Sequence, residues 1–226
     1  QTYLGSQVWR HPRFEIREYD IPTPGDDEVL LEVKACGICG SDVHMAQADQ
    51  DGYIFYPGLT GFPSILGHEF SGVVVEAGKK AFDKRTNKPF KGGEAVTSEE
   101  MLWCGSCKPC ADGYPNHCER LDEVGFNVNG AYAKYMVLPA RTLWSLEPLR
   151  KNYTKENLFL AGSLVEPTCV AYNAVIERGG GIRPGDRVVM VKTPSRGAMQ
   201  RAGDETVPPL ARGDDWLEAQ TVQRPS

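Results

Sequence analysis

Four cysteines crowded into one short segment are the strongest chemical signal in this sequence. They stand at Cys104, Cys107, Cys110 and Cys118 in CGSCKPCADGYPNHC, with spacings of two, two and seven residues. Zinc prefers four thiolates arranged as a tetrahedron about 2.3 Å from the metal, and CxxC turns present paired sulfurs to one centre. We therefore predict that these four residues hold a structural zinc ion.

A redox CxxC pair or a set of disulfides could also use cysteines at this spacing, but neither explains why a third and a fourth sulfur stand in the same short segment, and a redox pair leaves two thiols idle. A nucleic-acid-binding zinc ribbon uses the same ligands, but the formal net charge of -5 and the absence of a basic run nearby argue against it. Seven cysteines, an odd number, favour a reduced metal-binding protein over a secreted disulfide scaffold. We expect the protein in the cytoplasm.

A second group of potential ligands is spread over three segments. CGICGSDVH at 36–44 contains Cys39, GHE at 67–69 contains His68 and Glu69, and VEPT at 165–168 contains Glu166. One thiolate, one imidazole and two carboxylates can hold zinc and still leave a position for substrate. Taken singly, a residue such as His68 is more often a packed or surface histidine than a ligand, and one such as Cys39 is more often a small buried hydrophobic residue.

The elements that carry these residues are mostly strands. The segment 14–35 has two alternating apolar stretches around a Pro/Gly/Asp turn, which predicts two antiparallel strands. Short β-branched stretches recur at 70–78, 93–99 and 131–140. This pattern predicts a β-rich domain of barrel or sandwich type.

Beyond residue 140 the pattern changes. Thr154 is a candidate helix cap, a helical apolar spacing covers 167–178, and RPGD leads into a predicted strand at 187–191. The apolar runs are far shorter than the roughly 18 residues that span a bilayer. Together with the acidic charge balance, this predicts neither a membrane nor a nucleic-acid partner.

The runs GICGSDVH, LGHEFSGVVVEAG, the cysteine segment, EP before a helix and RPGDRVVM follow one another between residues 14 and 190. In this order they resemble the zinc-dependent medium-chain alcohol and polyol dehydrogenases, in the threonine, sorbitol and inositol branch. The resemblance implies a mainly β fold with helices. It implies a GroES-like (chaperonin-10-like) catalytic barrel domain with a structural zinc lobe, followed by the onset of a Rossmann domain.

The resemblance also implies roles for single residues. The positions of the catalytic zinc ligands are matched by Cys39, His68 and Glu69. Glu166 lies near the metal in polyol-type members and binds it directly or through water. Cys36 and Cys169 do not match ligand positions.

A proton relay is implied for Ser41 and His44, and Asp42 between them is expected to orient a ligand or the relay. Without the ligands alongside, Ser41 would be a turn residue and His44 a surface histidine. The aromatic residues Tyr53 and Tyr56, together with Phe55, form a hypothetical wall of the substrate pocket, although structural packing accounts for them equally well.

The implied activity is oxidation of a secondary alcohol in a polyol, cyclitol or hydroxy amino acid to a ketone. It would use one catalytic and one structural zinc, and NAD or NADP as hydride acceptor. The partner is then a small-molecule alcohol, and family members commonly form homo-oligomers. The alternative is a non-catalytic zinc-binding module that retains the dehydrogenase fold and binds one zinc only.

The last segment departs from the family pattern. A GxGxxG turn is expected after the strand at 187–191, but the chain continues with a Pro-, Gly- and Arg-rich sequence and only 35 residues follow Val191. We expect a catalytic domain at 1–178, a linker and first strand at 179–191, and a disordered tail at 192–226 that reflects truncation or a shifted reading frame. On this expectation the isolated chain binds zinc but neither binds NAD(H) usefully nor turns over.

Overall fold

The computed structural model describes residues 2–3, 6–7 and 9–174. The chain divides into two compact units, 1–173 and 174–226, and nearly all of the second lies outside the described residues. The strand predicted at 187–191, the domain boundaries predicted at 178 and 191, and the tail also lie outside them.

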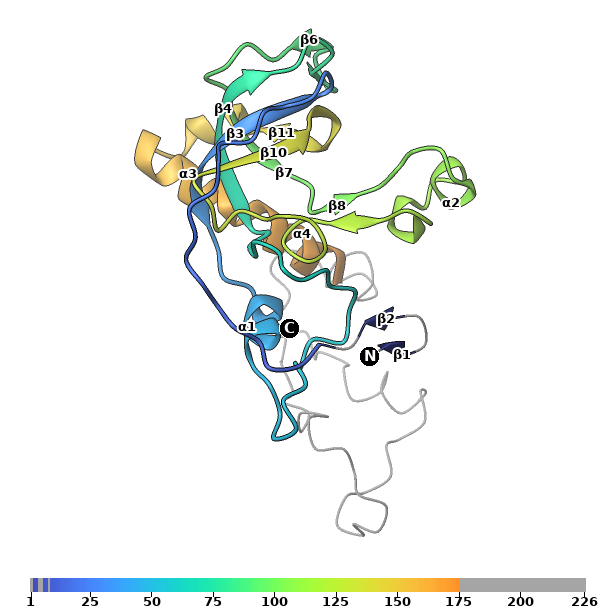
Figure 1. Ribbon diagram of the computed structural model, residues 1–226. Coiled ribbons are helices and arrows are strands. Elements are labelled where there is room, and N and C mark those ends of the chain that lie inside the picture. The colour runs from blue at the N-terminus through green and yellow to red at the C-terminus, as the bar shows by residue number, and fades with distance from the viewer. Residues whose placement is uncertain (1, 4–5, 8, 175–226) are drawn as a thin grey trace, which may run out of the picture. The chain divides into compact units, whose positions relative to one another are not determined.

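A five-stranded antiparallel sheet organises the first unit (Figure 1). Its order is β10-β3-β4-β7-β11. The strands are β3 (Glu28–Cys36), β4 (Phe70–Ala77), β7 (Ala95–Ser98), β10 (Tyr135–Pro139) and β11 (Leu143–Ser145). The strands predicted around 70–78, 93–99 and 131–140 are thereby confirmed, and so is the mainly β fold.

The main hydrophobic core is built by alternate residues of these strands. Fully buried side chains include Val29 and Leu31 of β3, Val74 of β4, Val96 of β7 and Leu138 of β10. They share one cluster because strand residues two apart lie on the same face of a sheet. The alternation seen in the sequence therefore marks the core correctly from β3 onward.

The strand expected in the first half of 14–35 is absent, and this prediction was wrong. In the sheet, β3 pairs with β10 along one edge and with β4 along the other, so neither edge is free for a preceding hairpin strand. Residues 14–21 instead form no regular element and have exposed apolar side chains, among them Phe14 (64% exposed) and Ile21 (60% exposed). A cavity of about 1660 Å³ is lined by this segment and by β10.

Three two-stranded ribbons complete the strand inventory of the described residues. They are β1 (Thr2–Tyr3) with β2 (Ser6–Gln7), β5 (Phe82–Asp83) with β6 (Lys88–Pro89), and β8 (Met101–Leu102) with β9 (Asp122–Glu123). The β8–β9 ribbon carries the cysteine lobe, residues 103–121, with α2 (Lys108–Ala111) and the 3-10 helix η1 (Pro115–His117). In Figure 1 this lobe extends beyond β8 and β9, away from the sheet.

Helices connect and cover the strands. They are α1 (Gly40–Ala46), the 3-10 helices η2 (Ala140–Thr142) and η3 (Glu147–Lys151), α3 (Lys155–Ser163) and α4 (Val165–Tyr172). Thr154 directly precedes α3, as predicted, and α3 packs on β3, β4 and β7. The helix predicted from 167 begins two residues earlier, at Val165. None of the helices in the described part of the chain is both long and apolar enough to cross a membrane.

Candidate metal centres

The sheet register brings the segments of the second ligand group together. Cys36, the last residue of β3, pairs with Phe70, the first residue of the antiparallel β4. The residues that follow β3 and those that precede β4 therefore meet at one end of the sheet. As a result, the ligand atoms of Cys39, His68 and Glu69 all lie within 4.8 Å of one another. We call these three residues the triad.

Gly37 makes this close approach possible. Its N–H donates to the carbonyl oxygen of Glu69 over 2.7 Å. A Cβ atom at position 37 would lie 2.3 Å from Oε2 of Glu69 and 3.2 Å from its Cβ. Any larger residue at this position would displace the carboxylate that the triad requires.

His68 is the most buried member of the triad, with 4% of its surface exposed. Burial lowers the pKa of its imidazole, although the charges of Asp42 and Glu69 act in the opposite direction. The ring is therefore neutral near pH 7, which is the form that binds metals. Its Nε2 lies 3.4 Å from Oγ of Ser41, and its buried Nδ1 has no hydrogen-bond partner. A thiol, a neutral imidazole and a carboxylate in this arrangement fit a zinc ion with an open position.

Asp42 is buried beside the triad, with 4% exposure. Its Oδ2 accepts a hydrogen bond from the backbone N–H of Cys39 over 2.9 Å, and its Oδ1 accepts one from the N–H of Gly67 over 3.3 Å. The same Oδ1 lies 3.8 Å from Nδ1 of His68. Asp42 thus contacts both segments that carry the triad, as expected of a residue that orients ligands.

The two residues of the implied relay lie one helical turn apart on α1. Ser41 is half-buried and touches His68, whereas His44 is exposed to solvent. Residues three apart in a helix lie on the same face. Within the described part of the chain no hydrogen bond joins the two side chains.

Glu166 lies near the triad but does not join its ligand atoms. It is half-buried at the start of α4. Its pKa is raised by burial and, in addition, by the charge of Glu69. The structure therefore brings Glu166 within electrostatic reach of Glu69, outside the 4.8 Å group of the triad.

Two further carboxylates close to this region, Glu100 and Glu123, were not identified from the sequence. Burial raises the pKa of Glu100 to about 8, and the charges of Glu123 and Glu166 add to the effect. Glu100 precedes β8 and Glu123 ends β9, so the pairing of this ribbon brings them together. No local motif marks either residue, because only the strand register makes them neighbours.

Tyr56 packs in an aromatic cluster that also contacts His68. Its pKa is raised to about 12 by burial and by the charges of Glu123, Glu100 and Cys39. Its ring packs on Phe126 at 5.2 Å, and Phe126 also contacts the ring of His68 at 4.7 Å. Of the three aromatic residues proposed from the sequence, Tyr56 is thus linked to His68 through Phe126. Phe55 is 53% exposed.

The cysteine lobe gathers its four sulfurs. The Sγ atoms of Cys104, Cys107, Cys110 and Cys118 all lie within 4.8 Å of one another. The distance between Sγ of Cys107 and Sγ of Cys118 is 3.8 Å. A tetrahedron with about 2.3 Å between zinc and sulfur has an edge of about 3.8 Å, whereas a disulfide is about 2.05 Å long. All cysteines of the chain are free, so the geometry fits a closed zinc site.

Backbone N–H groups of the lobe donate hydrogen bonds to two of the sulfurs, those of Cys104 and Cys118. Sγ of Cys104 accepts hydrogen bonds from the N–H groups of Ser106 and Cys107 over 3.5 and 3.4 Å, and these bonds lower the pKa of Cys104 to about 5. Burial acts in the opposite direction on Cys110 and raises its pKa to about 12. A divalent cation deprotonates the thiols that coordinate it. With zinc bound, Cys104 and Cys110 would therefore both be thiolates despite their different pKa values.

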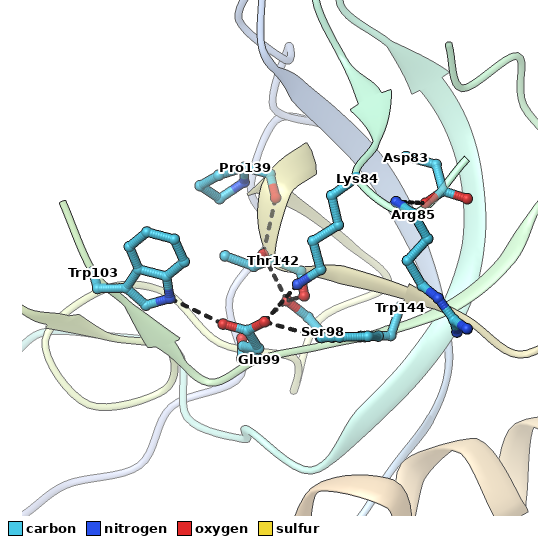
Figure 2. A network of polar contacts seen from close by, with 9 residues as sticks. All are labelled: Asp83, Lys84, Arg85, Ser98, Glu99, Trp103, Pro139, Thr142 and Trp144. Carbon is cyan, nitrogen blue, oxygen red and sulfur yellow. Dashed lines mark hydrogen bonds and ion pairs between the residues drawn. The ribbon is translucent and has the colours of Figure 1, made fainter. Parts of the chain in front are cut away.

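A polar network holds the base of the lobe to the edge of the sheet (Figure 2). The carboxylate of Glu99 accepts hydrogen bonds from Nζ of Lys84 over 2.6 Å, from Nε1 of Trp144 over 2.9 Å and from Nε1 of Trp103 over 3.0 Å. The ammonium of Lys84 also lies 3.8 Å from the ring centroid of Trp144. Because Trp103 directly precedes Cys104 and Trp144 belongs to β11, Glu99 ties the lobe to the sheet.

We expect Glu99→Gln to reduce the free energy of unfolding at pH 7 by about 1–3 kcal/mol. The melting temperature should fall accordingly. Burial alone would raise the pKa of Glu99, but the hydrogen bonds from Lys84, Trp103 and Trp144 outweigh it and lower the pKa. A lowered pKa stabilises the fold above the unfolded value, and this stabilisation is lost as the pH falls through the folded pKa.

Thermal unfolding of both proteins between pH 3 and pH 8 measures this effect, and the difference between them should shrink toward pH 3. The control is Glu147→Gln, which removes an exposed carboxylate paired with Arg150 and should cost less than about 1 kcal/mol. A difference independent of pH would contradict the role assigned to the charge of Glu99.

The chain has clear counterparts among known proteins. Residues 25–148 match the family described as the alcohol dehydrogenase GroES-like domain. The scyllo-inosose 3-dehydrogenase of Thermotoga maritima is 64% identical over 193 residues, which cover 84% of this chain and 48% of that protein. The chain therefore spans about half the length of this relative.

Solved structures show the same likeness. A Thermotoga maritima structure, assigned by its description to the alcohol dehydrogenases, matches with a TM-score of 0.73 and 64% identity, over 82% of this chain and 47% of that chain. An alcohol dehydrogenase of E. coli CFT073 in complex with NADH matches with a TM-score of 0.56 and 31% identity, over 75% and 44% of the two chains.

Proposed function

The chain belongs to the alcohol dehydrogenase family with a GroES-like domain, and on this premise we propose that it provides the metal-binding catalytic part of a zinc-dependent oxidoreductase. The reaction oxidises a secondary alcohol of a polyol, cyclitol or hydroxy amino acid to a ketone and transfers a hydride to NAD or NADP. The observation that carries this proposal is the triad, whose thiol, buried neutral imidazole and carboxylate converge within 4.8 Å.

Cys39, His68 and Glu69 are the proposed ligands of a catalytic zinc, and Cys104, Cys107, Cys110 and Cys118 those of a structural zinc. When bound at the triad, zinc supplies Lewis-acid polarisation of an alcohol oxygen. Glu166 lies beside Glu69, where its carboxylate can bind the metal directly or accept a hydrogen bond from a water molecule. Asp42 faces Nδ1 of His68, and Nε2 lies on the side of Ser41.

The proton of the substrate hydroxyl needs a path to solvent. Ser41 lies against His68 and can accept this proton while it donates its own onward. His44 follows one turn later on the same face of α1 and is exposed, so it can release the proton to water. The substrate thus loses one proton through these two residues and one hydride to the nicotinamide, which leaves a ketone.

The hydroxyl-rich substrate is supported by the polar groups beside the triad. Glu100 and Glu123, brought together by the β8–β9 pairing, and Tyr56, linked to His68 through Phe126, offer carboxyl and phenol oxygens that can bind further hydroxyl groups. The Thermotoga maritima relative is named for scyllo-inosose. The nicotinamide cofactor is supported by the NADH complex of the E. coli structure. An odd number of cysteines, seven, with four of them crowded into the lobe supports a reducing compartment, the cytoplasm.

Cobalt substitution tests this function in the chain itself. We expect the protein loaded with Co²⁺ to show a visible spectrum that changes when myo-inositol, sorbitol or L-threonine is added, with half-saturation at about 1 mM or below for the true substrate class. Cys39→Ser retains cobalt only in the lobe and should show no change. If none of the three compounds alters the wild-type spectrum, the proposed alcohol oxidation is wrong, and a non-catalytic zinc module remains.

A further inference from the structure

Tyr132 contacts the metal site from a distant part of the sequence. It belongs to the segment just before β10, and its hydroxyl lies 3.0 Å from Oδ2 of Asp42 and 3.1 Å from the carbonyl oxygen of Gly37. Oδ2 of Asp42 is also the atom that accepts the N–H of Cys39. The hydroxyl therefore lies at the point where Asp42 meets the segment that carries Cys39.

The ring of Tyr132 packs against the other ligand segment. Gly67, the residue before His68, has φ of +93°, and a Cβ atom there would lie 2.6 Å from Cδ1 of Tyr132. The backbone adds two hydrogen bonds, from the N–H of Ala131 to the carbonyl oxygen of Gly67 over 2.8 Å and from the N–H of Tyr132 to that of Leu66 over 2.9 Å. Tyr132 therefore contacts both ligand segments, the one that carries Cys39 and the one that carries His68.

Resting on the proposed function, we propose that Tyr132 is a positioning residue for the catalytic metal: its hydroxyl holds the carboxylate of Asp42, which binds the backbone N–H groups of Cys39 and Gly67 and lies opposite Nδ1 of His68. Without the hydroxyl, Oδ2 of Asp42 keeps only the N–H of Cys39. Oδ1 still accepts the N–H of Gly67, but over a longer 3.3 Å, so the carboxylate is held less firmly in its place opposite Nδ1 of His68. Partners that orient ligands typically contribute 10–100-fold to metal affinity.

The substitution Tyr132→Phe separates this role from a general structural one. It retains the ring against Gly67 and both backbone hydrogen bonds, so it removes the hydroxyl alone. The matched control is Tyr135→Phe in β10, a half-buried tyrosine whose ring lies under Nζ of Lys134 at 5.3 Å and takes no part in the Asp42 contacts.

The measurement is Zn²⁺ and Co²⁺ affinity by competition with a chelator. The absorption of cobalt at the triad distinguishes that site from the lobe, whose affinity serves as the internal standard. We expect Tyr132→Phe to weaken the triad about tenfold and to leave the lobe unchanged, and Tyr135→Phe to change neither. Because Tyr132 acts through Asp42, the double variant Tyr132→Phe/Asp42→Asn should bind no more weakly than Asp42→Asn alone.

The remaining outcomes overturn different statements. If the wild type binds metal only at the lobe, the proposed function fails and this inference fails with it. If the wild type binds two metals and Tyr132→Phe leaves the triad unchanged, weakens both sites equally, or adds fully to Asp42→Asn, only the positioning role of Tyr132 is wrong.

Discussion

Serine in place of Cys39 is expected to reduce the zinc content of the chain from two ions to one. Cys39 provides the only thiol among the three ligand atoms of the triad, and a neutral hydroxyl is a far poorer zinc ligand than a thiolate. Its backbone N–H, which binds Asp42, is unaffected by the substitution, so α1 and the sheet should remain folded. The lobe retains all four of its cysteines and should keep its zinc.

The measurement is metal content per chain after removal of loosely bound ions, together with a thermal melt. Cys36→Ser is the matched control, since Cys36 is also half-buried near the triad but its Sγ donates to the carbonyl oxygen of Gly37 over 3.4 Å and lies outside the ligand group. Cys36→Ser should retain two zinc ions. A wild-type protein with a single zinc that survives Cys39→Ser would favour the non-catalytic module instead.

The second large effect is expected in the lobe, where Cys107→Ser should release the structural zinc and open residues 103–121. Structural zinc sites contribute about 10–16 kcal/mol of apparent binding free energy, and this energy is also folding energy. The lobe buries little besides sulfur: Cys107 and Cys118 are 8% and 9% exposed, while most of their neighbours face solvent. Without the metal, the N–H···S bonds alone must order the segment.

Limited trypsin digestion measures this opening, with cleavage after the exposed Arg120 expected to be at least about tenfold faster in Cys107→Ser. Wild-type protein treated with a strong chelator should behave in the same way. Cys169→Ser, at an exposed position in α4, is the control and should digest like the wild type. Retention of two zinc ions by Cys107→Ser would show that the lobe does not use all four sulfurs.

The contrast between the two centres explains how much of the site could be predicted. In the lobe, all four sulfurs lie within one short segment, so spacing alone brings them within reach of one metal ion. In the triad, Cys39 and His68 are far apart in sequence, and they meet because the last residue of β3 pairs with the first residue of β4. Here the family resemblance implied which residues form the proposed ligand set. The register of two strands is the physical reason why these residues lie close together.

Strand prediction succeeded where a strand's pattern and its pairing agreed. β4, β7 and β10 lie where β-branched alternation predicted them. The stretch 14–22 alternates equally well, yet it forms no strand, because both edges of β3 are occupied by β4 and β10. Alternation reports which side chains can share a face, but whether a partner strand is available depends on the whole sheet.

The sequence by itself predicted the grouping of the four lobe cysteines and most strands of the sheet, and the family motif implied the three residues of the triad, because these depend on residue type and local spacing. The tertiary structure decided which distant groups surround the triad. Tyr132 reaches Asp42 across 90 residues of sequence, and Glu100 faces Glu123 only through the β8–β9 pairing. The reason is physical: hydrogen bonds and charges act through space, and folding sets those distances while sequence separation does not.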